Sequence, residues 1–583
     1  MPVPASAALP SRIRLAVAVA LGALALYLPG LGEGDFVGDD EALDAGVVWE
    51  MQRTGDWLFP EFNGEYLPPK PPLYYWLARL AALLHGGMDE WSQRLPSALC
   101  GAATVAVTVA AVAARGGPAP AALAGSMLAT TWVMRDQARL GRCDMTLTLL
   151  VTGCLLLAAS PQRLRRRRGL FWSLLGLAAI TKGGAGVGVV SAVVLAAALV
   201  ERSADRLRAL AGREAAVFAA IVAGWYGAAS WHWGGRFVDE QLIGENLRHL
   251  LGGTGISDQG AATRPLAYHL GYYPRHLFSA MLPWSLLLPP ALVGLWRDAE
   301  RWRAERFFVV WLAAGLLFFT FASRKSPYYL LPLAPAVSIV VTAWIFPVLR
   351  ASPAGRALEV PVGRRAMLGV LGVSAALWLA ALWLAALAAD GSCRARALAS
   401  GIGGHPFFAV GALWLVLGAA VGLVASVRRR RWDVAAGSAL AAVAGVLSLA
   451  NRLDGPLDDC VSLRPFAREA AAAVRPDDRI FFFRLPLPAV ALYAERRIPA
   501  LRDPAAAPER PFFLIVPESL AGEVPADWLE DAETVVAGRG RVFTRRTMGI
   551  QLLRIGAAPA TRLASAAEQP RRPSLVDTQP RRP

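Results

Sequence analysis

The stretch from Gly38-Asp39-Asp40-Glu41 to Pro68-Pro69-Lys70-Pro71-Pro72 directly follows the first apolar segment of the chain, and the rest of the sequence is organised around it. Three consecutive acids open the stretch, and a lysine among four prolines closes it. Only three lysines occur among the 60 basic residues, so each is a candidate for a task in which a compact ammonium and a forked guanidinium are not interchangeable. The positions of the three lysines in the chain decide whether a functional role is indicated for them.

Composition places the chain in the membrane. Hydrophobic residues make up 55% of 583 positions, charged residues 18%, and the mean hydropathy is +0.41. The net charge of +16 does not indicate nucleic-acid binding, because the arginines lie in short clusters between apolar runs, as they do in polytopic membrane proteins. The histidines and cysteines show no spacing typical of metal ligands.

Apolar runs of spanning length predict about thirteen transmembrane helices. The first covers residues 13–31, and the others lie at 95–114, 118–134, 144–160, 169–181, 183–200, 212–231, 276–296, 306–322, 327–349, 366–389, 406–427 and 433–450. The intervening loop 32–94 is too polar to span. It contains a helical pattern with an apolar face at Ala42, Ala45, Val48 and Trp49, and the aromatic segment Leu73–His85; we expect both to be helices at the membrane surface.

Arginine placement sets the expected orientation. Runs such as Arg165–Arg168 and Arg428–Arg431 fall in loops that face the cytoplasm if the N-terminus is cytoplasmic, whereas the short loops on the other side hold fewer cations. The three acids, all three lysines, Asp144 and the loop 232–275 then lie on the outer face. Acids and lysines from distant parts of the chain therefore converge on one side, where a site is expected.

The expected domains are a transmembrane domain at 1–450, an α/β domain at 451–555 and a disordered tail at 556–583. In the second domain, 479–483 and 512–516 read as buried strands, 465–474 and 489–496 as helices, and 542–544 with 551–554 as a closing hairpin. Cys393 and Cys460 fall outside the membrane and could form a disulfide in an oxidising compartment.

The candidate acids have simpler alternative roles. Asp39, Asp40 and Glu41 could cap a helix, but one acid would suffice, and neighbouring carboxylates raise one another's pKa, which suits a proton acceptor. Asp144 opens an apolar span and could be an N-cap, yet an acid at a membrane-embedded helix end is a functional candidate. A divalent cation near these acids is possible; no cofactor is otherwise indicated, and the sequence shows no dedicated metal site.

The candidate cations lie at three outer junctions. Lys70 is held on a stiff polyproline-like segment, Lys182 sits between two spans joined by almost no loop, and Arg324 with Lys325 precedes the phenols Tyr328 and Tyr329. Each alone could anchor to lipid headgroups. Together, beside the acids, they predict a site for a phosphorylated lipid that enters from the bilayer.

The sequence resembles the bacterial aminoarabinose (lipid A) transferases, within the protein-O-mannosyltransferase-like group of C-type membrane glycosyltransferases. Over about residues 12–350, the resemblance is carried by the acidic pair and by Gly55-Asp56-Trp57-Leu58-Phe59-Pro60, Lys70-Pro71-Pro72-Leu73-Tyr74-Tyr75-Trp76, Arg94-Leu95-Pro96-Ser97-Ala98, Asp144-Met145, Thr181-Lys182-Gly183, Leu282-Pro283-Trp284 and Lys325-Ser326-Pro327-Tyr328-Tyr329. The aminoarabinose enzymes tend to have Arg-Tyr where this chain has Leu43-Asp44, and the loop around Arg248 matches loosely, so the sugar is left open.

The resemblance implies a C-type fold that takes a sugar from a polyprenyl-phosphate donor on the outer face of the bacterial inner membrane. It implies catalytic roles for Asp40, followed by Glu41, and for Asp144. It also implies phosphate handling by Lys70, Lys182, Lys325 and Tyr329, with Arg324 beside them; Asp39, Arg248 and Tyr328 are further site candidates.

We expect an inverting, monomeric membrane glycosyltransferase with a periplasmic active site and C-terminal domain, acting on lipid A, a glycan or a protein. The competing hypothesis is a transporter or flippase of a lipid-linked sugar. Acids in a surface loop and the lack of evident inverted repeats favour the enzyme.

Overall fold

The computed structural model describes residues 9–36, 39–64, 67–248, 266–322, 325–350, 417–422, 424, 432–542 and 546–556. The chain separates into two compact units, Met1–Ser462 and Leu463–Pro583. The boundary lies beyond the expected position 451, because helix α22 (Trp432–Asp459) continues through it. Each unit is described by itself.

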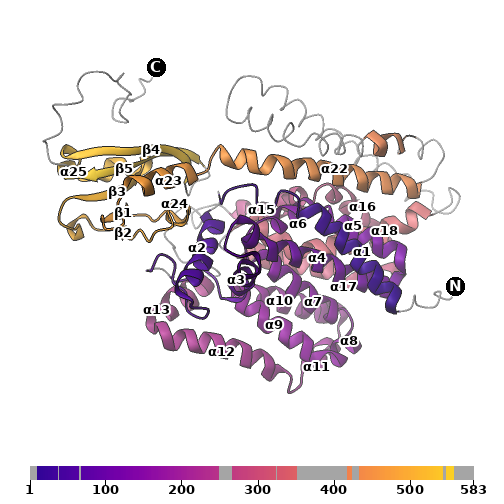
Figure 1. Cartoon of the computed structure of the whole chain (residues 1–583). Coiled ribbons are helices and arrows are strands. Elements are labelled where there is room, and N and C mark those ends of the chain that lie inside the picture. Colours follow the sequence, from indigo (N-terminus) through magenta and orange to yellow (C-terminus); the bar gives the residue numbers. More distant parts are fainter. Residues whose placement is uncertain are drawn as a thin grey trace. The chain divides into compact units, whose positions relative to one another are not determined.

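The first unit is helical (Figure 1). Its longer helices are α1 (Leu9–Tyr27), α2 (Asp39–Thr54), α3 (Leu73–His85), α4 (Glu90–Gly116), α5 (Pro118–Ala129), α7 (Asp144–Ala158), α9 (Arg168–Lys182), α10 (Gly184–Glu201), α12 (Ala215–Trp233), α15 (Leu266–Ala280), α16 (Leu288–Arg297), α17 (Ala299–Phe321), α18 (Ala334–Arg350) and α22. The short helix α6 (Trp132–Ala138), the π-helix η1 (Val238–Arg248) and the 3₁₀ helix η3 (Pro327–Leu333) lie between them.

Within the described residues, six helices are long and apolar enough to cross a membrane, or seven if the bent pair Ala267–Ala280 and Trp284–Arg297 counts as one span. The predicted segments at 118–134, 144–160 and 169–181 do form helices, but α5, α7 and α9 have only 12 to 15 residues. The predicted span at 366–389 and most of that at 406–427 lie outside the described residues, so the expected total of about thirteen stays a prediction.

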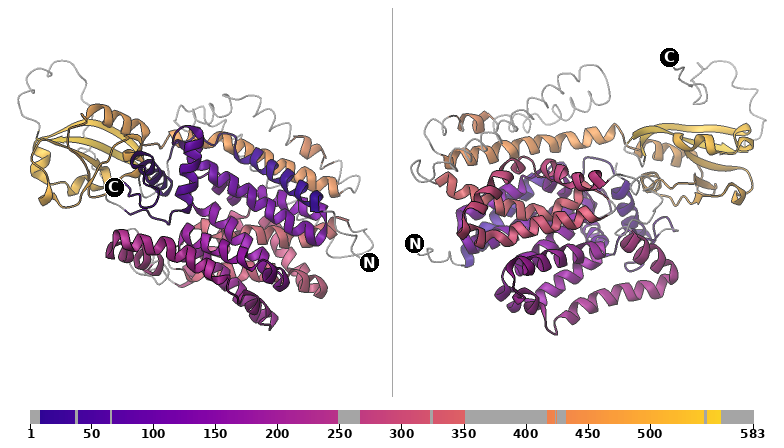
Figure 2. Two further views of the ribbon diagram at one scale, coloured as in Figure 1. Left: turned by 60° about the horizontal axis from the view of Figure 1, so that its bottom comes forward. Right: turned by 180° about the vertical axis from the view of Figure 1, so that it is seen from behind.

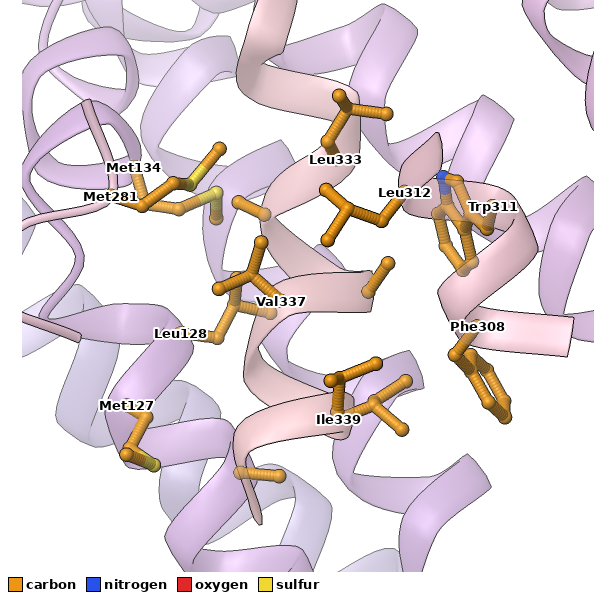
Figure 3. Close-up of a cluster of buried hydrophobic side chains, with 14 of the residues drawn as sticks. Met127, Leu128, Met134, Met281, Phe308, Trp311, Leu312, Leu333, Val337 and Ile339 are labelled. Carbon is orange, nitrogen blue, oxygen red and sulfur yellow. The ribbon is translucent and has the colours of Figure 1, made fainter. Parts of the chain in front are cut away.

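A continuous apolar core joins the helices of this unit. Side chains from α5, α6, α17, η3 and α18 meet in it, as Figure 3 shows for Met127, Leu128, Met134, Met281, Phe308, Trp311, Leu312, Leu333, Val337 and Ile339. Helix α22 packs against α1 and α18, so segments from the two ends of the unit lie side by side (Figure 2). This core fixes the helix ends at which the polar side chains meet.

Helix α2 differs from the expected surface helix with one apolar face. Ala42, Ala45 and Val48 are buried as predicted, but so are Asp44 and Glu50, which lie on other sides of the helix. The reason is tertiary: α3 packs against α2, and the ring of Phe62 lies so close to Gly46 that a Cβ there would meet it at 2.4 Å. Helix α3 begins and ends where predicted and leaves Leu80, Leu83 and Leu84 exposed.

The second unit is built on a five-stranded sheet with the order β2-β1-β3-β5-β4. Its strands are β1 (Ile480–Phe483), β2 (Ala500–Leu501), β3 (Phe512–Pro517), β4 (Ala532–Val542) and β5 (Arg546–Ile555). The buried runs 479–483 and 512–516 become β1 and β3, which pair in parallel, while β4 and β5 pair antiparallel. The predicted strand 551–554 lies within β5, but β4 begins already at Ala532 and contains only Val542 of the predicted 542–544; residues 543–544 lie outside the described residues. Helices α23 (Arg464–Ala473) and α24 (Pro488–Tyr493) also form where predicted.

The cysteines divide as the sequence suggested. Cys100, Cys143 and Cys154 are free, whereas Cys460, near the end of α22, is disulfide-bonded. The other half of the predicted pair, Cys393, lies outside the described residues.

Candidate functional site

Of the two adjacent acids at the start of α2, Asp40 is exposed to solvent and Glu41 is buried. The Asp40 side chain is 63% exposed, and its Oδ2 accepts a hydrogen bond from Arg142 Nη2 at 2.8 Å. Glu41, the next residue, is buried. This division follows from helix geometry, because successive side chains point about 100° apart around the axis. Of the two adjacent acids, Asp40 is therefore the one that a substrate can reach.

Glu41 links three segments in the interior. Its Oε1 accepts hydrogen bonds from Arg94 Nε at 2.8 Å and from the backbone N–H of Gly141 at 2.7 Å. Gly141 allows this approach, since a Cβ there would lie 2.6 Å from the Gln93 side chain. Arg94 also donates to the carbonyls of Leu31, Gly34 and Asp35. The Glu41 carboxylate thus ties α2 to α4 and to the segment before α7, and its charge is satisfied by Arg94.

Asp144 and Lys182 form a buried ion pair at one end of the helices. Asp144 is the first residue of α7 and Lys182 the last of α9; Asp144 Oδ1 lies 2.5 Å from Lys182 Nζ. The positive φ of Gly183 turns the chain directly into α10, as the near-absence of a loop predicted. Asp144 does not act as an N-cap: the position before α7 is Cys143, which makes no side-chain capping bond.

Arg142 joins the two acid sites. Besides its bond to Asp40, its Nε lies 3.6 Å from Asp144 Oδ2, a buried oxygen that has no hydrogen-bond partner among the described residues. Asp40, Arg142, Asp144 and Lys182 therefore form a row of alternating charge, which we call the charged cluster. The exposed acid of the charged cluster is Asp40, whereas Asp144 Oδ2 is buried beside Arg142.

Two phenols from η3 cover the cations of the charged cluster. The Arg142 guanidinium lies 5.2 Å from the ring centroid of Tyr328, and Lys182 Nζ lies 5.1 Å from that of Tyr329. The geometry is that of cation–π contacts, which hold a cation without neutralising it. Tyr328 and Tyr329 are thus brought to the charged cluster, in the neighbourhood that the sequence predicted for them.

Lys325 lies at a helix terminus instead. Its ammonium donates to the carbonyls of Phe319, Thr320 and Ala322, at 3.2, 2.5 and 2.7 Å, at the C-terminal end of α17. An ammonium has three N–H donors, and all three are occupied here. A cation in this place favourably satisfies the last carbonyls of a helix. The geometry therefore assigns Lys325 a capping position, apart from Asp144 and Lys182.

Lys70 is partly buried in the proline segment before α3, within electrostatic range of Asp44 and Asp144. Three further predicted site residues cannot be placed. Arg324 and the side chains of Asp39 and Arg248 lie outside the described part of the structure, although Asp39 begins α2 and Arg248 ends η1.

Two members of this neighbourhood were not among the predicted site residues. Arg142 lies two residues before Asp144, a position that is visible in the sequence. Asp44 was noted only as a departure from the aminoarabinose transferases, yet its spacing of four from Asp40 places both on one face of a helix. In the described residues, no group of three or more His, Cys, Asp or Glu side chains is arranged to hold a metal ion.

Comparison with known proteins was made for sequence and for structure. Residues 69–226 match the family model of dolichyl-phosphate-mannose-protein mannosyltransferases. A Pectobacterium atrosepticum protein, named undecaprenyl phosphate-alpha-4-amino-4-deoxy-L-arabinose arabinosyl transferase, is 28% identical over 57% of this chain and 59% of its own length. An uncharacterised Aquifex aeolicus protein is 27% identical over 56% of this chain and 63% of its own. The chain thus spans about 60% of the length of these relatives.

The fold is that of a solved membrane protein. The crystal structure of ArnT from Cupriavidus metallidurans bound to undecaprenyl phosphate superposes with a TM-score of 0.70 at 20% identity, covering 93% of this chain and 98% of that one. This likeness confirms the predicted polytopic C-type fold, and the sequence matches confirm the resemblance to the aminoarabinose transferases and to the protein mannosyltransferase group.

Proposed function

We propose that this multi-pass membrane protein, a relative of the aminoarabinose transferases, is an inverting glycosyltransferase that uses a polyprenyl-phosphate-linked sugar. It passes the sugar to lipid A, a glycan or a protein on the outer face of the inner membrane. The observation that carries the proposal is the charged cluster, which joins an exposed acid, Asp40, through Arg142 to the buried pair of Asp144 and Lys182.

The order of charges along the cluster suits displacement at an anomeric carbon. The acceptor hydroxyl attacks from the face opposite the lipid phosphate, so an acid for the acceptor and a cation for the phosphate are needed at separate positions. Asp40 is the exposed carboxylate and takes or aligns the acceptor proton. Arg142 pairs with that carboxylate and orients it.

The leaving phosphate requires positive charge, because negative charge grows on its oxygens in the transition state. Lys182 and Lys70 are the proposed donors to that phosphate. Lys182 is held by Asp144 and by the Tyr329 ring, so its ammonium is fixed before the donor arrives. The three donors of Lys325 are already engaged by helix carbonyls, so we leave it out of the phosphate site.

The described residues offer few ligands to a divalent cation. The Asp144 and Asp40 carboxylates would be the oxygens to hold it, but Arg142 pairs with both of them. When bound, the ion would add positive charge near the departing phosphate. Every role given above to the protein side chains is independent of it.

Replacing Asp40 by Asn is the direct test. The amide keeps the size of the side chain but cannot accept a proton, so we expect transfer to fall by about 100-fold or more while folding is retained. Mass spectrometry of cells that carry the variant should detect a polyprenyl-phosphate sugar accumulating on the outer side, together with loss of that sugar from one glycan.

The matched control is Glu33→Gln, since Glu33 is also an exposed acid paired with an arginine, Arg452, at 2.9 Å. It should leave the glycans unchanged. Near-normal transfer by Asp40→Asn would overturn the assignment of Asp40. If a carrier-linked sugar is trapped on the inner side and no glycan changes, the result would favour a flippase over a glycosyltransferase.

A further inference from the structure

A second acid lies one helical turn from Asp40. Asp44 is on the same face of α2 as Asp40, but its side chain is buried, with 5% of the residue exposed. Its Oδ1 accepts a hydrogen bond from the hydroxyl of Tyr75 on α3 at 2.8 Å. The chain therefore places a buried carboxyl directly behind its candidate catalytic acid.

The charged and titratable groups around Asp44 come from each segment packed near it. They are Asp40 on α2, Tyr74 and Tyr75 on α3, Lys70 in the proline segment, and Arg142 and Cys143 before α7. None of the tyrosines or the cysteine ionises near neutral pH, because burial raises the pKa of each. Of these four buried groups, Asp44 is the one whose raised pKa lies near neutral pH.

Burial raises the pKa of Asp44 to about 7, against the opposing effects of the Tyr75 hydrogen bond and Arg142. The described charges of the neighbourhood balance when Asp44 is ionised: Asp40, Asp44 and Asp144 face Lys70, Arg142 and Lys182. When Asp44 is neutral, the same neighbourhood carries one net positive charge.

We propose that Asp44 is a positioning residue whose protonation sets the net charge of the group formed by the charged cluster, Lys70 and Asp44 itself, so that an anionic phosphodiester binds more tightly when Asp44 is neutral. This inference rests on the proposed function, because it takes the charged cluster as the site of the lipid phosphate. Asp44 exchanges its proton with water and needs no contact with the sugar. It acts through Arg142 and Tyr75.

The experiment measures binding, not turnover. The probe is the methyl ester of a polyprenyl phosphate, a phosphodiester like the proposed donor, whose single charge does not change between pH 5.5 and 8.5. We expect the affinity of the wild-type protein to fall about tenfold across pH 7, the effect of one charge about 10 Å away at an effective dielectric constant of about 20. Asp44→Asn should keep the tighter, low-pH affinity throughout.

Tyr75→Phe tests the same inference by shifting the pKa of Asp44 without removing the carboxyl group. It removes the hydrogen bond that favours the ionised form of Asp44, so the fall in affinity should move to higher pH. This variant keeps Asp44 itself and so remains informative if Asp44→Asn does not fold. Glu50→Gln is the control, because Glu50 is also a buried acid of α2 but pairs with Arg53; its profile should match the wild type.

Two different failures are distinguishable. If the phosphodiester binds but its pH profile is unchanged in both Asp44→Asn and Tyr75→Phe, the role of Asp44 is overturned and the proposed donor site stands. If the wild-type protein binds no phosphodiester at any pH, the proposed donor site itself is overturned, and the inference with it.

Discussion

At the scale of single residues, side-chain chemistry explains why the scarce lysines do not share one role. Lys182 is part of the charged cluster, whereas the ammonium of Lys325 donates its three hydrogen bonds to helix carbonyls. The centre of the cluster is an arginine, Arg142, which reaches Asp40 through Nη2 and Asp144 through Nε. A forked guanidinium can bridge two carboxylates in this way, and a lysine cannot do so with fixed geometry. Scarcity is thus a weaker guide to function than donor geometry.

Asp44 leads to a stability prediction at this scale. Its folded-state pKa of about 7 lies above the ordinary aspartate value of 3.8, so between these values the folded state binds more protons than the unfolded state. The contribution to stability is then full below about pH 4 and is lost as the pH rises through about 7. Thermal unfolding in detergent should show a Tm that falls over this window in the wild type.

Asp44→Asn should flatten this dependence and raise the Tm at pH 8 relative to the wild type, because no charge then has to be buried. The Glu50→Gln variant controls for the loss of a buried acid from α2. An identical fall of the Tm in the wild type and in Asp44→Asn would contradict the raised pKa.

At the scale of elements, the site is made from helix ends. The N-terminal ends of α2 and α7 and the C-terminal end of α9 meet at the charged cluster. The tyrosines of η3 lie against its cations. Glu41 on α2 fixes the position of α2 relative to α4 and to the segment before α7, because its carboxylate accepts hydrogen bonds from Arg94 on α4 and from the N–H of Gly141. A buried carboxylate with two strong partners gives a fixed arrangement. The position of Asp40 relative to Arg142 depends on this contact.

The capping contacts at the end of α17 lead to a prediction for Lys325. Lys325→Met removes the ammonium from three helix carbonyls, so we expect the folded state to lose about 1–2 kcal/mol. Binding of the phosphodiester should not change. Lys182→Met is the comparison, and it should lose that binding. If Lys325→Met keeps its stability but loses the phosphodiester, then Lys325 does handle the phosphate, as the resemblance to the transferases implied.

At the scale of the whole molecule, α22 ties the last part of the helical unit to its beginning. Asn451 donates to the carbonyl of Leu26 at 2.6 Å and accepts from Arg135 Nε at the same distance. Asp454 pairs with Arg135 and Arg139, and Arg139 donates to the carbonyls of Tyr27, Pro29 and Gly30. The loop that leads to the acidic pair is thus held by a helix more than 400 residues later in the chain.

The division into two units predicts the effect of truncation. Every described side chain of the charged cluster belongs to Met1–Ser462. A chain that ends after Ser462 should therefore keep its helical content and bind the phosphodiester with unchanged affinity, measured by circular dichroism and the same binding titration. Loss of transfer with intact donor binding would assign acceptor recognition to the second unit. Loss of donor binding in a folded truncated chain would contradict the placement of the site in the first.

Much of the architecture could be predicted because it depends on local sequence. A run of apolar residues of spanning length must form a helix in lipid, where every backbone polar group needs a partner within its own segment. Local sequence also placed α3, the short turn at Gly183 and the strands β1 and β3 where they were predicted, because each follows from hydropathy or turn residues within its own segment. The prediction that acids and lysines gather at one place required only topology, and Asp40, Asp144 and Lys182 are found together.

Which of these side chains touch was decided only by tertiary structure. Asp40 and Glu41 are adjacent in sequence, yet one faces solvent and the other a buried arginine, because the partners that distinguish them come from other parts of the chain: Arg142 from the segment before α7 and Arg94 from α4. The burial of Asp44 depends on Tyr75 in the same way. The sequence by itself determined where most of the helices and the two parallel strands form, since these follow from hydropathy and local geometry. Packing between distant segments determined which carboxylate is free to react, because ion pairs and burial depend on neighbours that no local pattern specifies.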